Sequence, residues 1–330
     1  MSDTASYGFD TLQIHAGARP DPATGARQTP IYQTTAYVFR DADHAAALFN
    51  LQEVGYIYSR LTNPTVAVLQ ERIATLEGGV GAVCCSSGHA AQIMALFPLM
   101  GPGRNLVASN RLYGGTITQF SQTIKRFGWS AQFVDTEDLG AVSKAVDKNT
   151  RAIFCETIAN PGGYVTDIPA LAKIADRKGI PLIVDNTVVT PYLVQPLKHG
   201  ADIVVHSATK FLAGHGTVVA GAIVDGGKFE WSKSDKFPGL TEPDPSYHGV
   251  VYTAALGDAI AYIIKARVQL LRDLGPAVAP FNAFLIAQGI ETLSLRMERH
   301  ISNAQRVAEW LEQRDEVESV AYAGLPSSAW

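Results

Sequence analysis

The sequence has no excess of positive charge. Its 330 residues include 27 lysines and arginines against 31 aspartates and glutamates, which gives a formal net charge of −4. Proteins that bind nucleic acid neutralise a series of phosphates with basic side chains, and this composition offers no such surplus. We therefore expect no nucleic-acid partner.

Long apolar segments are also missing. A helix needs about 20 uninterrupted apolar residues to cross a bilayer, whereas the stretch from Tyr252 to Leu271 contains Asp258, Lys265 and Arg267. The first residues, Met1 to Tyr7, have neither the basic nor the apolar region of a secretory signal. We expect no membrane partner.

Cysteine is scarce. The three cysteines, Cys84, Cys85 and Cys155, each lie within an apolar run. A thiol in such a position usually behaves as a small buried hydrophobic group rather than as half of a disulfide. Since free thiols are typical of a reducing compartment, the sequence predicts a cytoplasmic protein.

Two common catalytic motifs are absent. No G-x-G-x-x-G follows an early strand, and the glycines between Gly78 and Gly81 precede their strand, which argues against a nicotinamide dehydrogenase. No H-E-x-x-H occurs and the eight histidines are scattered, which argues against a zinc enzyme. His215 is interpreted as structural or cofactor-adjacent, and we expect no metal.

The chain does contain a regular series of short apolar runs. With 330 residues, 47% of them hydrophobic, it can bury a large core and is long enough for about two domains. The runs alternate with helical patterns, which is typical of an α/β fold with a mostly parallel sheet flanked by helices. They are Ala82–Cys85, Asn105–Ala108, Ala131–Val134, Ala152–Cys155, Pro181–Val184, Ile203–His206 and Ala222–Val224.

The sequence divides into three parts. Residues 1–62 are broken by prolines and glycines and predict an extended arm of the kind that contacts a partner subunit. Residues 63–257 form the large domain, which a helix opens with Asn63 as N-cap and closes at Gly78. Residues 258–330 begin with an amphipathic helix and predict the start of a smaller α+β domain that is incomplete at Trp330.

Four of the apolar runs end in polar residues. Ligands of an open parallel sheet bind outside the carboxyl ends of its strands. Ser86 to His89 precede an alanine-rich helix, whose N-terminus favours a phosphate, although a plain turn is the alternative. Tyr113 precedes two glycines and can lie against a flat ligand or simply pack. Asp185 leaves a carboxylate where the sheet meets its crevice, or caps the next turn.

The fourth run is followed by a lysine. Lys210 lies between Thr209 and the apolar pair Phe211 and Leu212. A lysine side chain ordinarily has a pKa of about 10.4, and burial at this position would disfavour its charged form and activate it for Schiff-base chemistry. A solvated surface lysine is the alternative. Pyridoxal phosphate (PLP) needs a lysine, a carboxylate, a ring partner and a phosphate cradle, and all four occur here in order at strand ends.

Read with its flanking residues, the sequence resembles the Cys/Met-metabolism family of fold-type-I PLP-dependent transferases, and within it the O-acetylhomoserine sulfhydrylases. The resemblance extends from Leu12 to Trp330. Its most specific blocks are Gly55–Thr65, Val184–Thr187 and His206–Gly216.

The resemblance implies a role for each site residue. Lys210 would hold the cofactor as a Schiff base, Asp185 would pair with the pyridinium nitrogen, and Tyr113 would stack on the ring and assist proton movements. Asn160 would lie near the ring hydroxyl. The other cofactor-binding residues, several of them at the phosphate, would be Ser87, Gly88, His89, Ser207 and Thr209.

The resemblance also implies an assembly and a reaction. Tyr58 and Arg60 would reach the phosphate of the neighbouring subunit's cofactor in an obligate homodimer, usually paired into a homotetramer. The reaction would be γ-replacement on O-acetyl-L-homoserine, in which sulfide gives homocysteine and methanethiol gives methionine. The sequence does not distinguish between the two thiols. The preference for acetyl over succinyl esters is implied by the resemblance alone.

Two departures from the family pattern keep alternatives open. Related methionine γ-lyases usually have a cysteine where this chain has Gly115, so elimination is a near alternative, as is a cystathionine γ-synthase type of reaction. Family members continue beyond Trp330, where their substrate-carboxylate arginine lies, so a non-catalytic PLP-binding fragment is the alternative of another class. Arg296 and Arg299 are expected to serve packing or surface roles.

Overall fold

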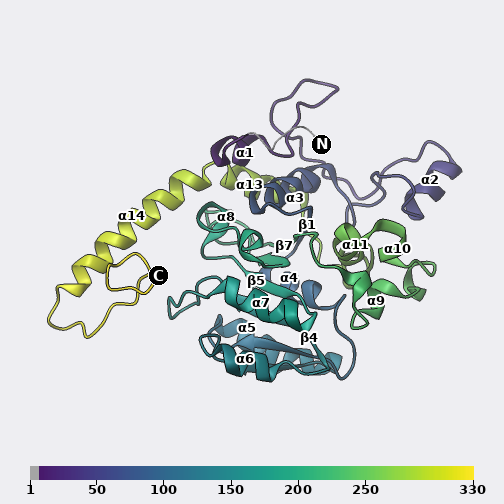
Figure 1. Cartoon of the computed structure of the whole chain (residues 1–330). Coiled ribbons are helices and arrows are strands. Elements are labelled where there is room, and N and C mark those ends of the chain that lie inside the picture. Colours follow the sequence, from purple (N-terminus) through teal and green to yellow (C-terminus); the bar gives the residue numbers. More distant parts are fainter. Residues whose placement is uncertain (1–6) are drawn as a thin grey trace.

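The computed structural model describes residues 7–330. The first six residues of the predicted arm, with most of the segment searched for a secretory signal, lie outside the described part. The described residues form a seven-stranded sheet in the order β1-β7-β6-β5-β4-β2-β3, in which β7 alone runs antiparallel to its neighbours (Figure 1). The mostly parallel sheet predicted from the apolar runs is therefore confirmed.

Each predicted run corresponds to one strand, within a residue or two at either end. Six of these strands are largely buried, which explains why their runs contain few polar residues, whereas the edge strand over residues 130–134 has no buried residue. The strands are β1 (Gly81–Cys85), β2 (Asn105–Ser109), β3 (Ser130–Val134), β4 (Thr150–Glu156), β5 (Leu182–Asp185), β6 (Ile203–His206) and β7 (Gly221–Asp225).

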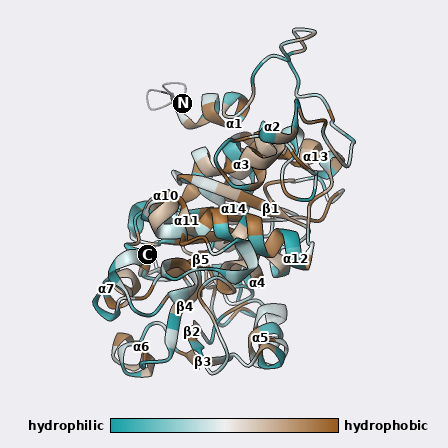
Figure 2. Ribbon diagram, turned by 90° about the vertical axis from the view of Figure 1, so that its right-hand side faces the viewer, coloured by the Kyte–Doolittle hydropathy of each residue, from teal (hydrophilic) through white to brown (hydrophobic). Residues whose placement is uncertain are grey.

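Helices cover both faces of the sheet. In Figure 2, α6 (Leu139–Ala145) and α7 (Ile168–Lys178) lie on one side of the strands, and α4 (Gly88–Leu96) and α5 (Gly114–Ser121) lie on the other. The N- and C-caps of α7 are Asp167 and Gly179. Because a helix separates each parallel strand from the next, the carboxyl ends of the strands gather at one edge.

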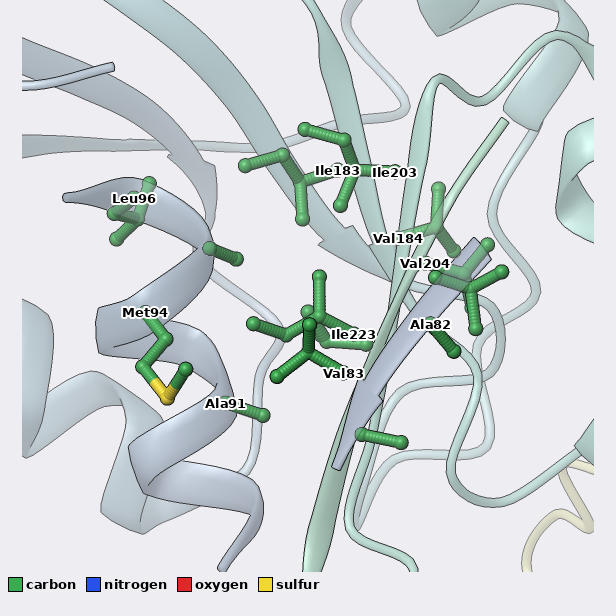
Figure 3. Close-up of a cluster of buried hydrophobic side chains, with 14 of the residues drawn as sticks. Ala82, Val83, Ala91, Met94, Leu96, Ile183, Val184, Ile203, Val204 and Ile223 are labelled. Carbon is green, nitrogen blue, oxygen red and sulfur yellow. The ribbon is translucent and has the colours of Figure 1, made fainter. Parts of the chain in front are cut away.

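The core lies where α4 packs against the centre of the sheet. Figure 3 shows Val83 of β1, Ile183 of β5 and Ile223 of β7 on the side of the sheet that faces Met94 of α4, and Val204 of β6 on the opposite side. Each of these side chains has 0% of its surface exposed. The strands that carry the candidate site residues are thus anchored in close-packed hydrophobic side chains, which leave little freedom for their ends.

The predicted helix at the start of the large domain is α3 (Pro64–Glu77). Asn63 caps it by accepting hydrogen bonds from the backbone N–H groups of Thr65 and Val66 at 3.0 and 3.4 Å. Gly78 ends the helix with a φ of +78°, a left-handed conformation that glycine adopts without strain. The capping residues read from the sequence are confirmed.

The amphipathic helix predicted after Gly257 is continuous but not uniformly α-helical. It begins as α11 (Asp258–Lys265), continues as a π-helix over Ala266–Leu271 and ends as α12 (Arg272–Leu274). Arg267 in the π segment is half-buried and donates hydrogen bonds to the Leu61 and Ala82 carbonyls at 3.2 and 3.0 Å. The segment thereby fastens the end of the arm to β1.

Two longer helices follow. The predicted helical stretch near Phe281 is part of α13 (Pro280–Ile290), and α14 (Leu293–Glu312) extends away from the sheet (Figure 1). Residues 313–330 contain neither helix nor strand. In the described part of the chain, none of the helices is both long enough and apolar enough to span a membrane.

The arm contains more helix than its sequence suggested, because α1 (Phe9–His15) and α2 (Ala42–Phe49) interrupt it. The remaining short helices lie in the connections between strands and in the later part of the chain. They are α8 (Thr190–Leu193), α9 (Pro238–Thr241) and α10 (Tyr252–Leu256), with 3₁₀ turns at Thr123–Phe127, Pro196–His199, Trp231–Lys233 and Pro245–Tyr247.

Candidate active site

The phosphate loop predicted after β1 begins α4. Ser87 is its N-cap, and the Ser87 Oγ accepts a hydrogen bond from the Ala90 N–H at 3.1 Å. A Cβ atom added at Gly88 would lie 2.7 Å from the Ser207 Cβ, so the backbone here comes closer to the β6 loop than any other residue would allow. The α4 N-terminus and Ser207 therefore lie side by side, and the backbone dipoles of the helix favour an anion there.

The carboxylate of Asp185 lies at the end of β5 and is held from two sides. Its Oδ2 accepts a hydrogen bond from the Gln92 Nε2 at 3.2 Å, and its Oδ1 accepts from the Thr187 N–H at 3.0 Å. The Thr187 hydroxyl also donates to Oδ1 and in turn accepts a hydrogen bond from the Ser207 N–H at 2.7 Å. A continuous hydrogen-bonded path thus joins the Asp185 carboxylate to Ser207 at the predicted phosphate site.

A second carboxylate, Glu156, holds the loops that follow β2 and β4. Its Oε1 accepts a hydrogen bond from the Tyr113 N–H at 2.6 Å, and its Oε2 accepts from the Asn160 N–H at 3.0 Å. Burial raises the pKa of Glu156 to about 7, and the nearby charge of Asp185 acts in the same direction. This one side chain fixes the backbone of both predicted ring-side residues.

The side chain of Tyr113 extends into the open edge of the site, with 49% of its surface exposed. The His89 ring lies beside it, with 5.8 Å between the ring centroids. The Nε2 atom of His89 is buried and has no hydrogen-bond partner within residues 7–330. A Cβ atom added at Gly115 would lie 2.6 Å from Tyr113 Cε1 and 2.8 Å from His89 Cε1, so this glycine leaves room for both rings.

Lys210 occupies the turn after β6. Its N–H donates to the Ser207 carbonyl at 3.2 Å, and its carbonyl accepts from the Gly214 N–H at 2.7 Å. The side chain is exposed in the single chain, which differs from the burial expected from the apolar residues after it. Phe211 and Leu212 pack beneath the turn rather than over the lysine, because both belong to or contact the hydrophobic core.

The hydroxyl of Thr209, another of the predicted phosphate residues, is hydrogen-bonded twice to the backbone of Ala220. Its hydroxyl donates to the Ala220 carbonyl at 3.1 Å and accepts from the Ala220 N–H at 3.0 Å. Asn160 is exposed, and no side-chain hydrogen bond fixes it among the described residues. Both residues lie at the carboxyl edge of the sheet, as the sequence predicted.

Tyr58 and Arg60 contact each other, and Arg60 contacts the segment after the π-helix. Their side chains contact each other, with the Arg60 guanidinium 5.4 Å from the centre of the Tyr58 ring. Arg60 also donates a hydrogen bond to the Arg272 carbonyl. Within residues 7–330, no hydrogen bond connects either side chain to Asp185, Ser207 or Lys210.

Arg296 supports the lysine turn from α14. Its guanidinium donates to the Phe211 carbonyl at 2.8 Å, and burial lowers its pKa from the ordinary value. Arg299 on the same helix is exposed. Both arginines thus have the packing and surface roles predicted for them.

Sequence reasoning missed two supporting side chains. Gln92 lies on the buried side of α4 and hydrogen bonds to both Asp185 and Thr116, the latter at 3.0 Å. Glu156 is the last residue of β4, and its carboxylate holds the backbone of Tyr113 and Asn160. A polar residue in an otherwise apolar run is the signal that could have identified each of them, because buried polar groups are hydrogen-bonded in folded proteins.

The chemistry of these groups fits PLP. A lysine, a carboxylate held by donors, a tyrosine ring and an anion-binding helix N-terminus converge at the carboxyl edge of one sheet, which is the set that this cofactor requires. The close approach of Gly88 and Ser207 provides the backbone concavity that a phosphate needs. The fold and the site together define a fold-type-I PLP-dependent enzyme.

Comparisons with known proteins lead to the same class and narrow it. The model of the Cys/Met metabolism PLP-dependent enzyme family matches residues 10–329. This chain belongs to that family. It is 52% identical to the O-acetyl-L-homoserine sulfhydrylase of Leptospira meyeri over 96% of this chain and 73% of the relative. It is 51% identical to the homocysteine synthase of Schizosaccharomyces pombe over 98% of this chain and 75% of that relative.

A solved structure agrees in detail with the fold. It is a putative O-acetylhomoserine (thiol)-lyase from Campylobacter jejuni that carries N′-pyridoxyl-lysine-5′-monophosphate. The two chains superpose with a TM-score of 0.94 at 43% identity, covering 98% of this chain and 79% of the other. A cofactor joined to a lysine is therefore found in a close structural relative.

The raised pKa of Glu156 predicts a pH-dependent stability. The pKa of the side chain is about 7 in the folded protein and about 4.5 in the unfolded chain. The folded protein therefore holds the proton more tightly, and this contribution to the free energy of unfolding is fully present below pH 4.5. That contribution is lost as the pH rises to about 7, and the loss amounts to about 3 kcal/mol, at 1.36 kcal/mol for each unit. Glu156→Gln does not titrate, so the variant should lose less stability than the wild type between pH 5 and pH 8.

Denaturant unfolding of both proteins at the two pH values measures this difference. The two carboxylates Asp202 and Asp225, whose pKa values burial also raises to about 7, are present in both proteins and cancel in the comparison. Equal losses for wild type and variant would contradict the assignment of a raised pKa to Glu156.

Proposed function

We propose that this protein catalyses γ-replacement on O-acetyl-L-homoserine, with sulfide giving homocysteine or methanethiol giving methionine, and acetate released. The proposal rests on the 52% identity to an O-acetyl-L-homoserine sulfhydrylase over 96% of this chain. The hydrogen-bonded path from Asp185 through Thr187 to Ser207 supports it, because it joins two of the groups that the cofactor requires.

The site residues have separate tasks in holding the cofactor. The α4 N-terminus with Ser87, Gly88 and Ser207 would receive the phosphate. Asp185, whose carboxylate accepts hydrogen bonds from the Gln92 side chain and from the N–H and hydroxyl of Thr187, would pair with the protonated ring nitrogen. When bound, PLP supplies an electron sink that makes protons at Cα and then Cβ of an amino-acid substrate acidic enough to remove.

The ring-side residues would position the cofactor and the substrate. Tyr113 would lie against the ring face and keep water from it, and Asn160 would approach the ring hydroxyl. Glu156 sets the position of both through their backbone N–H groups. His89 and Thr209 complete the proposed cofactor-binding set, Thr209 through the Ala220 backbone that it holds.

Lys210 would hold the cofactor and then move protons between Cα and Cβ of the substrate. The Cγ–O bond of the ester breaks with its electron pair leaving on acetate, and a Cγ–S bond forms from the sulfur lone pair of the thiol. Because proton transfer by a positioned side chain contributes roughly a factor of 10² to 10⁴ in rate, the position of the Lys210 amine is decisive.

We propose that the working unit is a homodimer, paired into a tetramer, with a site shared between subunits. Tyr58 and Arg60 would reach the phosphate of the neighbouring subunit's cofactor. The arm supports this proposal because it exposes large hydrophobic side chains over a short stretch, and such patches mark interaction surfaces. They are Ile31, Tyr32, Val38, Phe49, Val54, Tyr56 and Tyr58.

The remaining assignments are also proposals. Residues 63–257 would form the large PLP-binding domain, and residues 258–330 would form the start of the smaller one. A cytoplasmic location is supported by the three free and buried cysteines, which are typical of a reducing compartment.

Replacing the lysine tests the central claim. The PLP-loaded wild type should absorb in the visible range, lose that band on reduction with borohydride, and form homocysteine from O-acetylhomoserine and sulfide. Lys210→Ala should lack the reducible band and turn over at least about a hundredfold more slowly. Lys198→Ala, an exposed lysine that precedes β6 at the opposite end of the strand, should behave like the wild type. A wild type with the band but without homocysteine formation would refute the proposed reaction.

Mixed subunits test the shared site. Lys210→Ala and Arg60→Ala should each be nearly inactive alone. After random mixing, half of the dimers contain one subunit of each kind, and one of the two sites in such a dimer has both residues intact. About one quarter of the wild-type activity should therefore return on mixing. No recovery in a mixture shown to contain heterodimers would place Arg60 outside the neighbour's site.

The two glycines after Tyr113 provide a matched pair of variants. A Cβ at Gly115 would collide with Tyr113 and His89, whereas a Cβ at Gly114 has no atom within 4 Å. Gly115→Ala should displace the Tyr113 ring and lower kcat/KM by about tenfold or more, because displacements near 1 Å are costly at reacting centres. Gly114→Ala should stay within about twofold of the wild type, and equal effects of the two substitutions would contradict this account of Gly115.

A further inference from the structure

A cluster of buried polar side chains lies directly behind the candidate active site. Glu77 is the last residue of α3, His206 is the last residue of β6, Asn186 follows β5 and Thr157 follows β4. Their exposed fractions are 0%, 1%, 0% and 4%. We call these four residues the Glu77 cluster. None of them has a part in the reaction proposed above.

Hydrogen bonds connect the Glu77 cluster into one unit. The Oε1 atom of Glu77 lies 2.6 Å from the His206 Nε2 and accepts a hydrogen bond from the Asn186 Nδ2 at 2.9 Å. The Oδ1 atom of Asn186 accepts from the Thr157 hydroxyl at 2.8 Å. One carboxylate oxygen thus joins the ends of β5 and β6, and Asn186 extends the connection to β4.

Each strand-end member of the cluster is next to a residue of the site. Asn186 follows Asp185, His206 precedes Ser207 and Thr157 follows Glu156. The Thr157 N–H also donates to the Asp185 carbonyl at 3.0 Å. A shift of Glu77 would therefore move the backbone beneath the ring-nitrogen carboxylate and beneath the phosphate surface at the same time.

Stability alone does not account for this arrangement. Taking a carboxylate and an imidazole out of water is unfavourable, and apolar side chains of similar volume would commonly give an equally stable core. The Oε2 of Glu77 and the Nδ1 of His206 have no hydrogen-bond partner within residues 7–330, so the described chain leaves part of the desolvation free energy uncompensated. Hydrogen bonds of fixed length do, however, set the spacing of three strand ends more narrowly than apolar contacts would.

We infer that Glu77 is a positioning residue, which acts through Asn186 and His206 to fix the distance between Asp185 and Ser207. The inference rests on the proposed function insofar as that proposal assigns Asp185 and Ser207 to the cofactor. It adds that the spacing between ring nitrogen and phosphate is set from behind the sheet, by a residue that does not touch the cofactor.

Two variants change the cluster while preserving its shape. Glu77→Gln keeps one acceptor oxygen but replaces the other with an N–H donor group. Thr157→Val removes the hydroxyl that donates to Asn186. For each purified protein, PLP is removed, unfolding of the cofactor-free form is measured, and the PLP dissociation constant is obtained by titrating the visible band at pH 8.

The matched control lies at the opposite ends of the same two strands. The Oδ2 atom of Asp202, just before β6, accepts a hydrogen bond from the Leu182 N–H at the start of β5 at 2.8 Å. Asp202→Ala therefore weakens the β5 and β6 pair without touching the edge that holds the site. The PLP affinity of Asp202→Ala shows how much a loss of stability alone weakens PLP binding.

Glu77→Gln should raise the PLP dissociation constant about tenfold. Substitution of a residue that supports the ligand-contacting residues commonly weakens binding by such a factor. It should also lower kcat about tenfold with little change in KM. Thr157→Val should act in the same direction by a smaller factor, and it decides the question if Glu77→Gln does not fold. Asp202→Ala should remain within about twofold of the wild type in both quantities.

The inference is overturned if the folded cluster variants bind PLP like the wild type. It is equally overturned if their loss of affinity only matches that of Asp202→Ala at a comparable loss of stability. The titration needs no substrate, so its result is separate from the proposed reaction. If the wild type binds PLP but forms no homocysteine, the reaction is wrong and the comparison of variants still decides the role of Glu77.

Discussion

The parallel alignment of β4, β5 and β6 is the constraint on which the rest of this structure depends. It carries Glu156, Asp185 and Ser207 to one edge of the sheet, where hydrogen bonds of 2.6 to 3.2 Å connect them to α4 and to the loops after β2 and β5. The apolar side chains of these strands are buried in the close-packed core, so this edge of the sheet has little freedom to move. These three residues, which span 51 positions in the sequence, thereby gain fixed positions relative to one another.

The sequence was informative where one local rule determines the structure. Seven apolar runs predicted seven strands, because strands buried on both faces tolerate few polar residues. Asn63 and Gly78 predicted the limits of α3, since capping depends on a single side chain or a single positive φ. The positions of Asp185 and Lys210 after their strands followed from the same runs. The short helices α1 and α2 in the arm were missed, because prolines and glycines nearby obscured their periodicity.

The sequence was less informative where contacts between distant segments determine the position of a side chain. Gln92 hydrogen bonds to Asp185 across 93 positions, and Glu77 approaches His206 across 129 positions. Neither contact is visible in the local sequence, apart from a polar residue within an apolar run. The exposure of Lys210 depends on what Phe211 and Leu212 pack against, which is the hydrophobic core rather than the lysine. The roles proposed for Tyr58 and Arg60 would involve a second subunit, which no single-chain pattern describes.

The one reversed strand affects the order in which the molecule can be assembled. The ladder partner of β1 is β7, whose first residue follows the last residue of β1 by more than a hundred positions, so β1 must wait for most of the large domain before it joins the sheet. Non-local pairing of this kind slows folding because a long loop has to close first. The glycine and serines that follow β1 therefore meet Ser207 late, and a newly made chain completes most of its sheet before the proposed phosphate site can form.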